Sequence, residues 1–360
     1  MAKKKTLTLA QQIDAQIEAT GPMSLATYMG LCLTHPRDGY YTMGRPIGAA
    51  GDFITAPEIS QMFGELIGFF LVNLWQQMGQ PTSFTLLELG PGRGTLMQDA
   101  LRAATKADGF ENALHLQLFE SNALLKEEQE KRLGAYSPYW ATDIDAVSDD
   151  PIFVVANEFF DALPIRQYMK TDDGWHERLV GLKDGVRTIG LSPTPIAESA
   201  APREVHGAFP GEILELSPAA VDTMQRLARK VALQGGAILA IDYGYGRTQT
   251  GDSLQAVKDH AFADLLEAPG DADLSAHVNF GVLAEAAKAS GLAVAPLAEQ
   301  GDWLLRVGLG ERARKLARSN PHEAANIARA VERLSSPEQM GKLFKVFCAH
   351  SPGLKPAGFA

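Results

Sequence analysis

The feature that most constrains the fold is a glycine-rich turn that follows a short apolar segment. Residues 84–89 (FTLLEL) have the composition of a strand covered on both faces, and 90–95 (GPGRGT) follow directly. The next residues, LMQDALRAA, have a helical pattern. Glycines there let the backbone turn sharply and approach a ligand, and the free N–H groups of the helix start face the same place. A plain tight turn is the structural alternative.

Short apolar segments recur along the chain with helix-like stretches between them. Besides 84–89 they are 114–119, 152–157, 212–216 and 237–242, and the stretch 217–233 is an example of an intervening amphipathic helix. Alternating strands and helices favour a parallel sheet wrapped on both sides by right-handed crossovers. The sequence therefore predicts an α/β fold with a Rossmann-like, doubly wound sheet.

Composition changes along the chain suggest its regions. A long apolar stripe that begins at Glu58 predicts a helix, which Gly79 and Pro81 end. Two turns, DDG and KDG, predict hairpins over 166–191. We expect a helical N-terminal region with a cofactor-side loop (1–82), a sheet core (83–310) with a hairpin and loop insertion (166–210), a helical insertion (311–338) and a C-terminal strand and tail (339–360).

The charge balance argues against a broad basic surface. The 360 residues include 33 Lys and Arg against 43 Asp and Glu, a net charge of −10, which argues against nucleic acid as a partner. Cys32 and Cys348 are too far apart for a disulfide framework or a metal cluster, and we expect no metal site. No apolar run is long enough for a signal peptide or a membrane span. These features predict a cytoplasmic protein without membrane insertion.

The acids around the glycine turn indicate which ligand it binds. Thr95 occupies the position where a dinucleotide fingerprint needs Gly or Ala. Glu88 lies inside the first strand and Glu120 ends the next one, where a carboxylate can accept hydrogen bonds from both ribose hydroxyls. The pattern favours S-adenosylmethionine, although Glu120 alone would be read as a solvated acid. The predicted cofactor residues are Glu88, Gly90, Pro91, Gly92, Gly94, Thr95, Glu120, Asn157, Thr55 and Glu58; Thr55 and Glu58, with Asp52, precede or open the long helix and are expected to close over the cofactor.

Five segments in order resemble a known family. They are 51–65 (GDFITAPEISQMFGE), 88–95 (ELGPGRGT), 157–164 (NEFFDALP), 242–245 (DYGY) and 273–280 (DLSAHVNF). The chain is similar to the MidA-like class I methyltransferases from residue 21 to residue 347, although Asn279 stands where the family's last segment has an acid. The resemblance implies a seven-stranded class I sheet and S-adenosylmethionine as methyl donor. One family member is a mitochondrial protein arginine methyltransferase that assists assembly of respiratory complex I, so the resemblance also implies dimethylation of an arginine in a complex I subunit.

The acceptor side is predicted after the strand 152–157. Glu158 and Asp161 follow that strand, and two carboxylates in bidentate contact would fix a guanidinium plane and hold its charge away from the attacking nitrogen. Acids that stabilise a helix start are the alternative reading. His277 is predicted as a general base or an orienting group, with a structural histidine as the alternative.

Three functions stay open on the sequence alone. They are a protein arginine methyltransferase, a methyltransferase of small molecules or RNA on the same fold, and a non-catalytic assembly factor that keeps the cofactor fold. The sequence also leaves open the acceptor, the mono- or dimethylated product, a homodimer as against a monomer, and a lid as against an interface role for the N-terminal helices.

Overall fold

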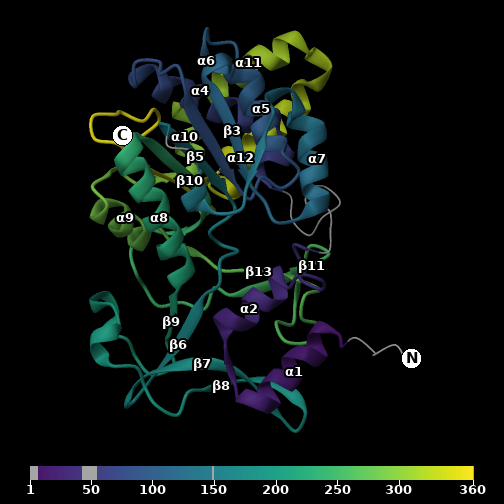
Figure 1. The fold of residues 1–360 in the computed structure, drawn as a ribbon, viewed down its shortest axis with the longest axis vertical. Helices are drawn as coiled ribbons and strands as arrows, with labels where there is room; N and C mark the ends of the chain where they lie inside the picture. The colour runs from purple at the N-terminus through teal and green to yellow at the C-terminus, as the bar shows by residue number, and fades with distance from the viewer. Residues whose placement is uncertain (1–6, 43–54, 148–149, 360) are drawn as a thin grey trace. The chain divides into compact units, whose positions relative to one another are not determined.

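The computed structural model describes residues 7–42, 55–147 and 150–359 (Figure 1). The chain forms two compact units, each built from separate stretches of sequence. Unit 1 comprises Met1–Pro46, Asp161–Val221 and Arg247–His277, and unit 2 comprises Ile47–Phe160, Asp222–Gly246 and Val278–Ala360. This division differs from the sequence-predicted regions. The helices expected in 1–82 belong partly to unit 1 and partly to unit 2, and the insertion 166–210 belongs to unit 1.

Unit 2 contains a mixed sheet with the strand order β15-β17-β10-β5-β2-β3-β4. Its strands are β2 (Phe84–Leu89), β3 (Leu114–Phe119), β4 (Tyr139–Ala141), β5 (Ile152–Asn157), β10 (Gly236–Tyr245), β15 (Ala293–Val294) and β17 (Phe344–His350), with β14 (Val278–Asn279) on β10 and β16 (Ala298–Glu299) on β17. The pairings among β2, β3, β4, β5 and β10 are parallel, whereas β17 runs antiparallel to β10. The α/β prediction is confirmed, and the strand order reverses at β2, where β3 and β5 lie on opposite sides.

Helices pack against this sheet and against one another. They are α3 (Ala56–Ile59), α4 (Gln61–Gln77), α5 (Thr95–Ala104), α6 (Phe110–Ala113), α7 (Ala123–Leu133), α8 (Pro218–Gln234), α9 (Phe280–Ala289), α10 (Gln300–Arg306), α11 (Leu309–Ser319), α12 (Ala324–Ser335) and α13 (Met340–Leu343). The helix expected from Glu58 onward is two helices, because Ser60 has extended backbone (φ −162°) and its hydroxyl caps α4 at Met62 N. A Cβ at Gly68 would lie 2.2 Å from Ala100 O, so the glycine lets α4 pack closely on α5.

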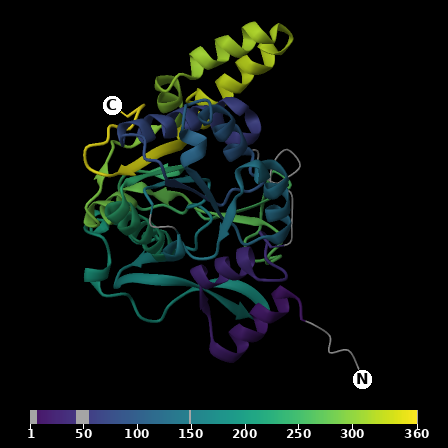
Figure 2. The ribbon, with the colours of Figure 1, turned by 45° about the horizontal axis from the view of Figure 1, so that its top comes forward.

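Two helices of unit 2 form a hairpin. Figure 2 shows α11 and α12 side by side, extending from the rest of the unit in yellow-green. The hairpin corresponds to the helical insertion that the sequence predicts over 311–338. In β14, Asn279 accepts a hydrogen bond from Val282 N and thereby caps α9. The acid that usually stands at this position of the family segment could cap the helix in the same way.

Unit 1 consists of short helices and antiparallel strands. Its elements are α1 (Leu9–Thr20), β1 (Met23–Ser24), α2 (Leu25–Thr34), β6 (Arg166–Thr171), β7 (Gly174–Lys183), β8 (Val186–Leu191), β9 (Ile213–Leu216), β11 (Gln255–Lys258), β12 (Ala261–Ala263) and β13 (Asp273–Ser275). The hairpins expected over 166–191 are present. The segment 212–216, expected in the parallel sheet, instead forms β9 and pairs antiparallel with β6.

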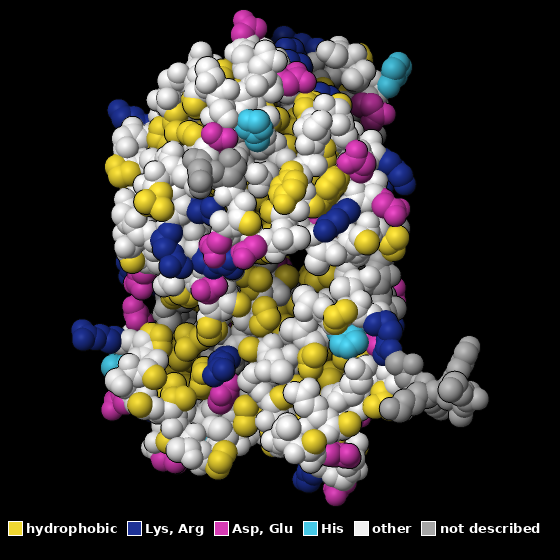
Figure 3. Space-filling model, in the orientation of Figure 1, with side chains coloured by type: hydrophobic (Ala, Val, Ile, Leu, Met, Phe, Trp, Pro, Cys, Tyr) yellow, Lys and Arg dark blue, Asp and Glu magenta, His cyan; other side chains and the backbone are white. Residues whose placement is uncertain are grey.

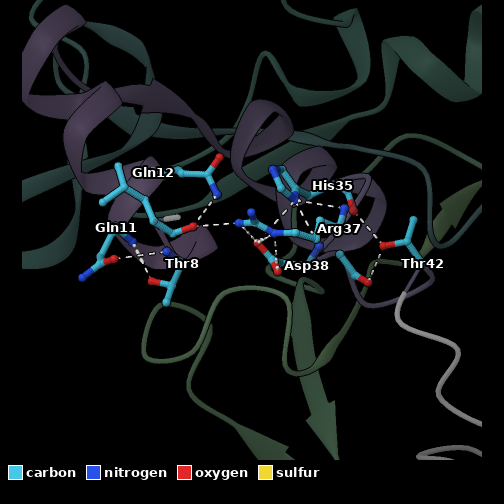
Figure 4. A network of polar contacts seen from close by, with 9 residues as sticks. Thr8, Gln11, Gln12, His35, Arg37, Asp38 and Thr42 are labelled. Atoms are coloured by element: carbon cyan, nitrogen blue, oxygen red, sulfur yellow. Dashed lines mark hydrogen bonds and ion pairs between the residues drawn. The ribbon is translucent and has the colours of Figure 1, made fainter. Parts of the chain in front are cut away.

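A polar network ties the chain after α2 to the start of α1 (Figure 4). Arg37 Nη2 donates to Leu7 O at 2.7 Å, and the same guanidinium pairs with Asp38 at 2.7 Å. Thr8 caps α1 and forms a capping box with Gln11. These contacts fix the beginning of the segment between α2 and α3, in the region expected to carry the cofactor-side loop (1–82); residues 43–54 lie outside the described residues.

Candidate functional site

The predicted glycine turn joins β2 to α5. Gly90, Gly92 and Gly94 have φ of 61°, 51° and 78°, a left-handed backbone that favours glycine. A Cβ at Gly90 would lie 3.1 Å from Phe159 Cδ2, so the neighbouring loop also leaves little room for a side chain. Gly94 caps α5 without a side-chain hydrogen bond, and the first-turn N–H groups are left for a ligand.

Glu88 is a buried carboxylate with an unsatisfied oxygen. Its side chain is 2% exposed, and its Oε2 has no hydrogen-bond partner among the described residues. Burial, together with the nearby charge of Glu120, raises the pKa of Glu88 to about 8. A buried orphan oxygen is costly to keep, which indicates a ligand that supplies the missing donor.

Glu120 lies just beyond β3, as predicted. Its Oε1 accepts a hydrogen bond from Asn122 N at 2.8 Å, and its Oε2 accepts one from Gln129 Nε2 at 3.3 Å. Burial raises the pKa of this carboxyl, and the hydrogen bonds oppose the shift. The carboxylate is thus oriented beside the glycine turn before any ligand arrives.

Sequence reasoning missed Gln129. This side chain of α7 is fully buried, and its Nε2 also donates to Gly92 O at 2.6 Å while its Oε1 accepts from Trp140 Nε1 at 2.7 Å. One amide therefore connects the glycine turn, Glu120 and β4. Its position in the polar stretch ALLKEEQEKRL gave no signal, because nothing in that pattern marks which polar side chain turns inward.

Helix α3 is fastened to the glycine turn, which agrees with the predicted position of Glu58. Thr95 Oγ1 donates to Glu58 Oε1 at 2.7 Å, and Arg93 Nη1 lies 3.7 Å from Glu58 Oε2. Thr55 precedes α3 as its N-cap residue without a side-chain cap. Asp52, expected beside it, lies outside the described residues.

A strained bend follows β5. Asn157 Oδ1 is buried without a hydrogen-bond partner among the described residues, and Asn157 Nδ2 donates to Glu158 Oε1 at 3.1 Å. Glu158 has φ 50°, which is unfavourable for a non-glycine residue. The bend is held by β10, since Glu158 N donates to Ile241 O and Phe160 N donates to Asp242 Oδ2 at 3.0 Å. Strain of this kind is typical of functional sites.

The other predicted acceptor residues belong to unit 1. Ala276 N donates to Asp161 O at 3.0 Å, so the structure brings the segments of Asp161 and His277 together. His277 N in turn donates to Ser253 Oγ at 2.9 Å. Glu158, which the sequence pairs with Asp161, belongs to unit 2.

The described residues fit the predicted cofactor. Glu88 offers a buried carboxyl oxygen without a hydrogen-bond partner, Glu120 an oriented carboxylate, and α5 an uncapped N-terminus for a carboxylate. Among the described ranges no three His, Cys, Asp or Glu side chains form a metal site, and no described helix is long and apolar enough to cross a membrane. On the face drawn in Figure 3, basic and acidic side chains are interspersed and form no broad basic area.

Comparison with known proteins identifies the same cofactor and class of enzyme. Residues 66–297 match a family model described as "Putative S-adenosyl-L-methionine-dependent methyltransferase". A solved structure titled as a "likely methyl transferase from Burkholderia thailandensis bound to S-adenosyl-homocysteine" superposes with a TM-score of 0.84, at 27% identity over 97% of this chain and 93% of that one. The predicted class I fold, enzyme class and cofactor are confirmed.

Curated relatives are similar over nearly the whole chain. Two proteins named "Protein arginine methyltransferase NDUFAF7, mitochondrial" are each 34% identical to it. The Danio rerio protein matches 94% of this chain and 86% of its own length, and the Homo sapiens protein 96% and 84%. The expectation of a cytoplasmic protein was wrong, because these relatives are named mitochondrial; the absence of a leader-like apolar run carried no information about the compartment.

Proposed function

We propose that this chain, which belongs to the family of S-adenosyl-L-methionine-dependent methyltransferases, methylates an arginine side chain of a protein. The observation that carries the proposal is its 34% identity, over nearly its whole length, to proteins named protein arginine methyltransferases. From the family resemblance we take a respiratory complex I subunit as the first acceptor to test. A homodimer is a further proposal, which sedimentation of the purified chain would test.

The donor side lies in unit 2. The uncapped start of α5 would hold the carboxylate of the cofactor's amino acid portion, Glu88 its ammonium group, and Glu120 the ribose hydroxyls. When bound, S-adenosylmethionine would supply a methyl group on a positively charged sulfur: a guanidinium nitrogen would bond to the methyl carbon, the C–S bond would break to release S-adenosylhomocysteine, and the nitrogen would lose one proton. Gly90, Gly92 and Gly94 let the backbone approach this ligand, and α3 with Glu58 and Thr55 flanks the turn.

The acceptor side begins at Glu158. A guanidinium keeps its positive charge at any ordinary pH, so a carboxylate that binds two of its nitrogens localises the charge away from the third. Glu158 is fixed at the strained bend beyond β5, next to the buried Oδ1 of Asn157. Asp161 and His277 remain predicted acceptor-side residues, each to be tested by its own variant.

The test is transfer of a labelled methyl group. Purified chain, methyl-labelled S-adenosylmethionine and isolated respiratory complex I are incubated, and the labelled subunit is analysed by mass spectrometry for methylated arginine. We expect label on arginine, and Glu158→Gln should lower the rate by about 100-fold or more while changing S-adenosylhomocysteine affinity by less than about threefold. Glu127→Gln, an exposed change on α7, is the matched control and should keep full activity.

Other outcomes would point to the alternative functions. Label on a small molecule or on RNA, with none on protein, would contradict arginine methylation. Full support of complex I assembly by Glu158→Gln without detectable transfer would favour a non-catalytic assembly factor.

A further inference from the structure

The hairpin of α11 and α12 carries a charge opposite to that of the whole chain. Between Leu309 and Ser335 there are six Lys and Arg side chains and three Glu, in a chain of net charge −10. The exposed cations of α11 are Arg314, Lys315 and Arg318. Arg314 pairs with Glu311 at 2.8 Å, whereas Lys315 and Arg318 form no ion pair with any residue that the structure describes.

A groove runs along the same helix. A hollow of about 420 Å³ opens at the start of α11, and its apolar lining includes Leu66, Phe69 and Val307, with Lys106 and Lys315 beside them. Phe69 is 46% exposed, although most of the apolar side chains of α4 are buried. A second hollow of about 350 Å³ also borders Lys315 and continues to Arg318. The two hollows share one wall, and we call them together the α11 groove.

The groove is held in shape by a buried ion pair. Glu65 on α4 is 2% exposed and accepts from Arg312 Nη2 and from Arg102 Nη1, each at 2.7 Å. The contact fixes α11 on α4 and neutralises Arg312. Glu311 also lines both hollows, but it is paired with Arg314. Binding therefore needs little rearrangement, and among the described residues the unpaired charges left for a partner are those of Lys106, Lys315 and Arg318.

We propose that the α11 groove docks an acidic segment of a partner protein that carries one large apolar side chain. The apolar side chain would cover Phe69 and fill the hollow beside it, while carboxylates pair with Lys315 and Arg318. Exposed ion pairs are individually weak, so the apolar anchor supplies most of the affinity and the cations supply selectivity for an acidic partner. The groove residues are separate from the cofactor residues, so the inference adds a docking surface to the proposed methyltransferase.

Binding of a defined probe tests this inference. The full chain is titrated into a fluorescein-labelled twelve-residue peptide of Glu and Asp with one central Trp, and anisotropy is measured. We expect a Kd on the order of 10 µM in about 50 mM salt, with clear weakening at about 300 mM salt. The double variant Lys315→Glu with Arg318→Glu should weaken binding by about tenfold or more, and Phe69→Ser by about fivefold or more. Lys288→Glu, an exposed change on α9, is the matched control and should change affinity by less than about twofold.

Several results would overturn the inference. They are equal affinity in the charge-reversal variant, equal binding of a peptide with Lys and Arg in place of Glu and Asp, or binding only to phosphatidylserine vesicles or to a single-stranded oligonucleotide. Each variant is also titrated with S-adenosylhomocysteine. If cofactor binding and methyl transfer persist while no variant alters peptide binding, the docking site is refuted and the proposed function stands.

Discussion

At the scale of single residues, unfavourable features of the chain gather at the ends of β2 and β5. Glu88 Oε2 and Asn157 Oδ1 are buried without partners among the described residues, and Glu158 has a left-handed backbone. Each feature costs roughly 1–3 kcal/mol when nothing compensates it. Their coincidence at the point where the strand order reverses is what distinguishes a ligand site from a merely tight turn.

The protonation of Glu88 should make cofactor binding depend on pH. Its pKa of about 8 means that the free enzyme holds this carboxyl protonated at neutral pH, whereas an ammonium group favours the ionised form. S-adenosylhomocysteine affinity should therefore rise from pH 6 to pH 8, with release of a proton. Calorimetry in buffers of different ionisation enthalpy would measure that release.

Glu88→Gln is the control for this pH dependence of cofactor affinity. The same carboxyl should also make the free energy of unfolding depend on pH. The variant should bind with no proton release and with little pH dependence. Because the folded pKa lies above the unfolded value near 4.3, the wild type binds the extra proton when folded, and its free energy of unfolding should fall as pH rises from about 5 to 8. A wild type whose affinity is flat with pH would contradict this role of Glu88.

Gln129 should control cofactor affinity without taking part in transfer. Gln129→Leu removes the donor to Gly92 O and Glu120 and leaves Trp140 Nε1 unpaired, so we expect S-adenosylhomocysteine affinity to fall by about tenfold. With saturating cofactor, kcat should remain within about threefold. Gln98→Leu is the comparison variant. It also removes a glutamine of this unit, namely the one that accepts a hydrogen bond from Arg132 on α7. A loss confined to kcat would contradict a positioning role.

At the scale of elements, the sequence predicts strands well where burial on both faces leaves a clear apolar run. β2, β3 and β5 have the predicted bounds. The prediction placed the segment of β9 in the parallel sheet, which was wrong. Glu215 of this strand is buried and accepts hydrogen bonds from Gln167 and Ser253, and no local sequence pattern reveals these contacts. The cofactor residues were likewise predictable because their motif is local, whereas Gln129 depends on how α7 packs.

The packing of α11 on α4 should depend on one carboxylate. Burial alone would raise the pKa of Glu65, but Arg312 and Arg102 reverse this effect and lower it. Glu65→Ala leaves Arg312 unpaired and should reduce the free energy of unfolding by roughly 2–4 kcal/mol at pH 7, measured by urea denaturation. Since the lowered pKa stabilises the fold above the unfolded pKa, the difference from wild type should shrink below about pH 4. Glu111→Ala, an exposed change in α6, should cost less than about 0.5 kcal/mol.

At the scale of the whole molecule, the two units are assembled from interleaved segments. Tyr28 OH, for example, donates to Leu265 O within unit 1, across 237 positions of sequence. Hydrophobic periodicity reports only local structure, so the sequence placed region boundaries after residues 82 and 310, and neither separates the units. Contacts of such range decide which segments form one unit.

This division predicts where the cofactor changes protection from hydrogen exchange. Every predicted cofactor residue that the structure describes, from Thr55 to Asn157, belongs to unit 2. Saturating S-adenosylhomocysteine should therefore slow amide exchange by about 100-fold in peptides covering the glycine turn and α7, because it stabilises only states in which these segments are folded. Peptides covering the β7–β8 hairpin of unit 1 serve as the internal control and should exchange at an unchanged rate. Equal protection of both sets would mean that the units open together, and protection of the hairpin alone would place the ligand elsewhere.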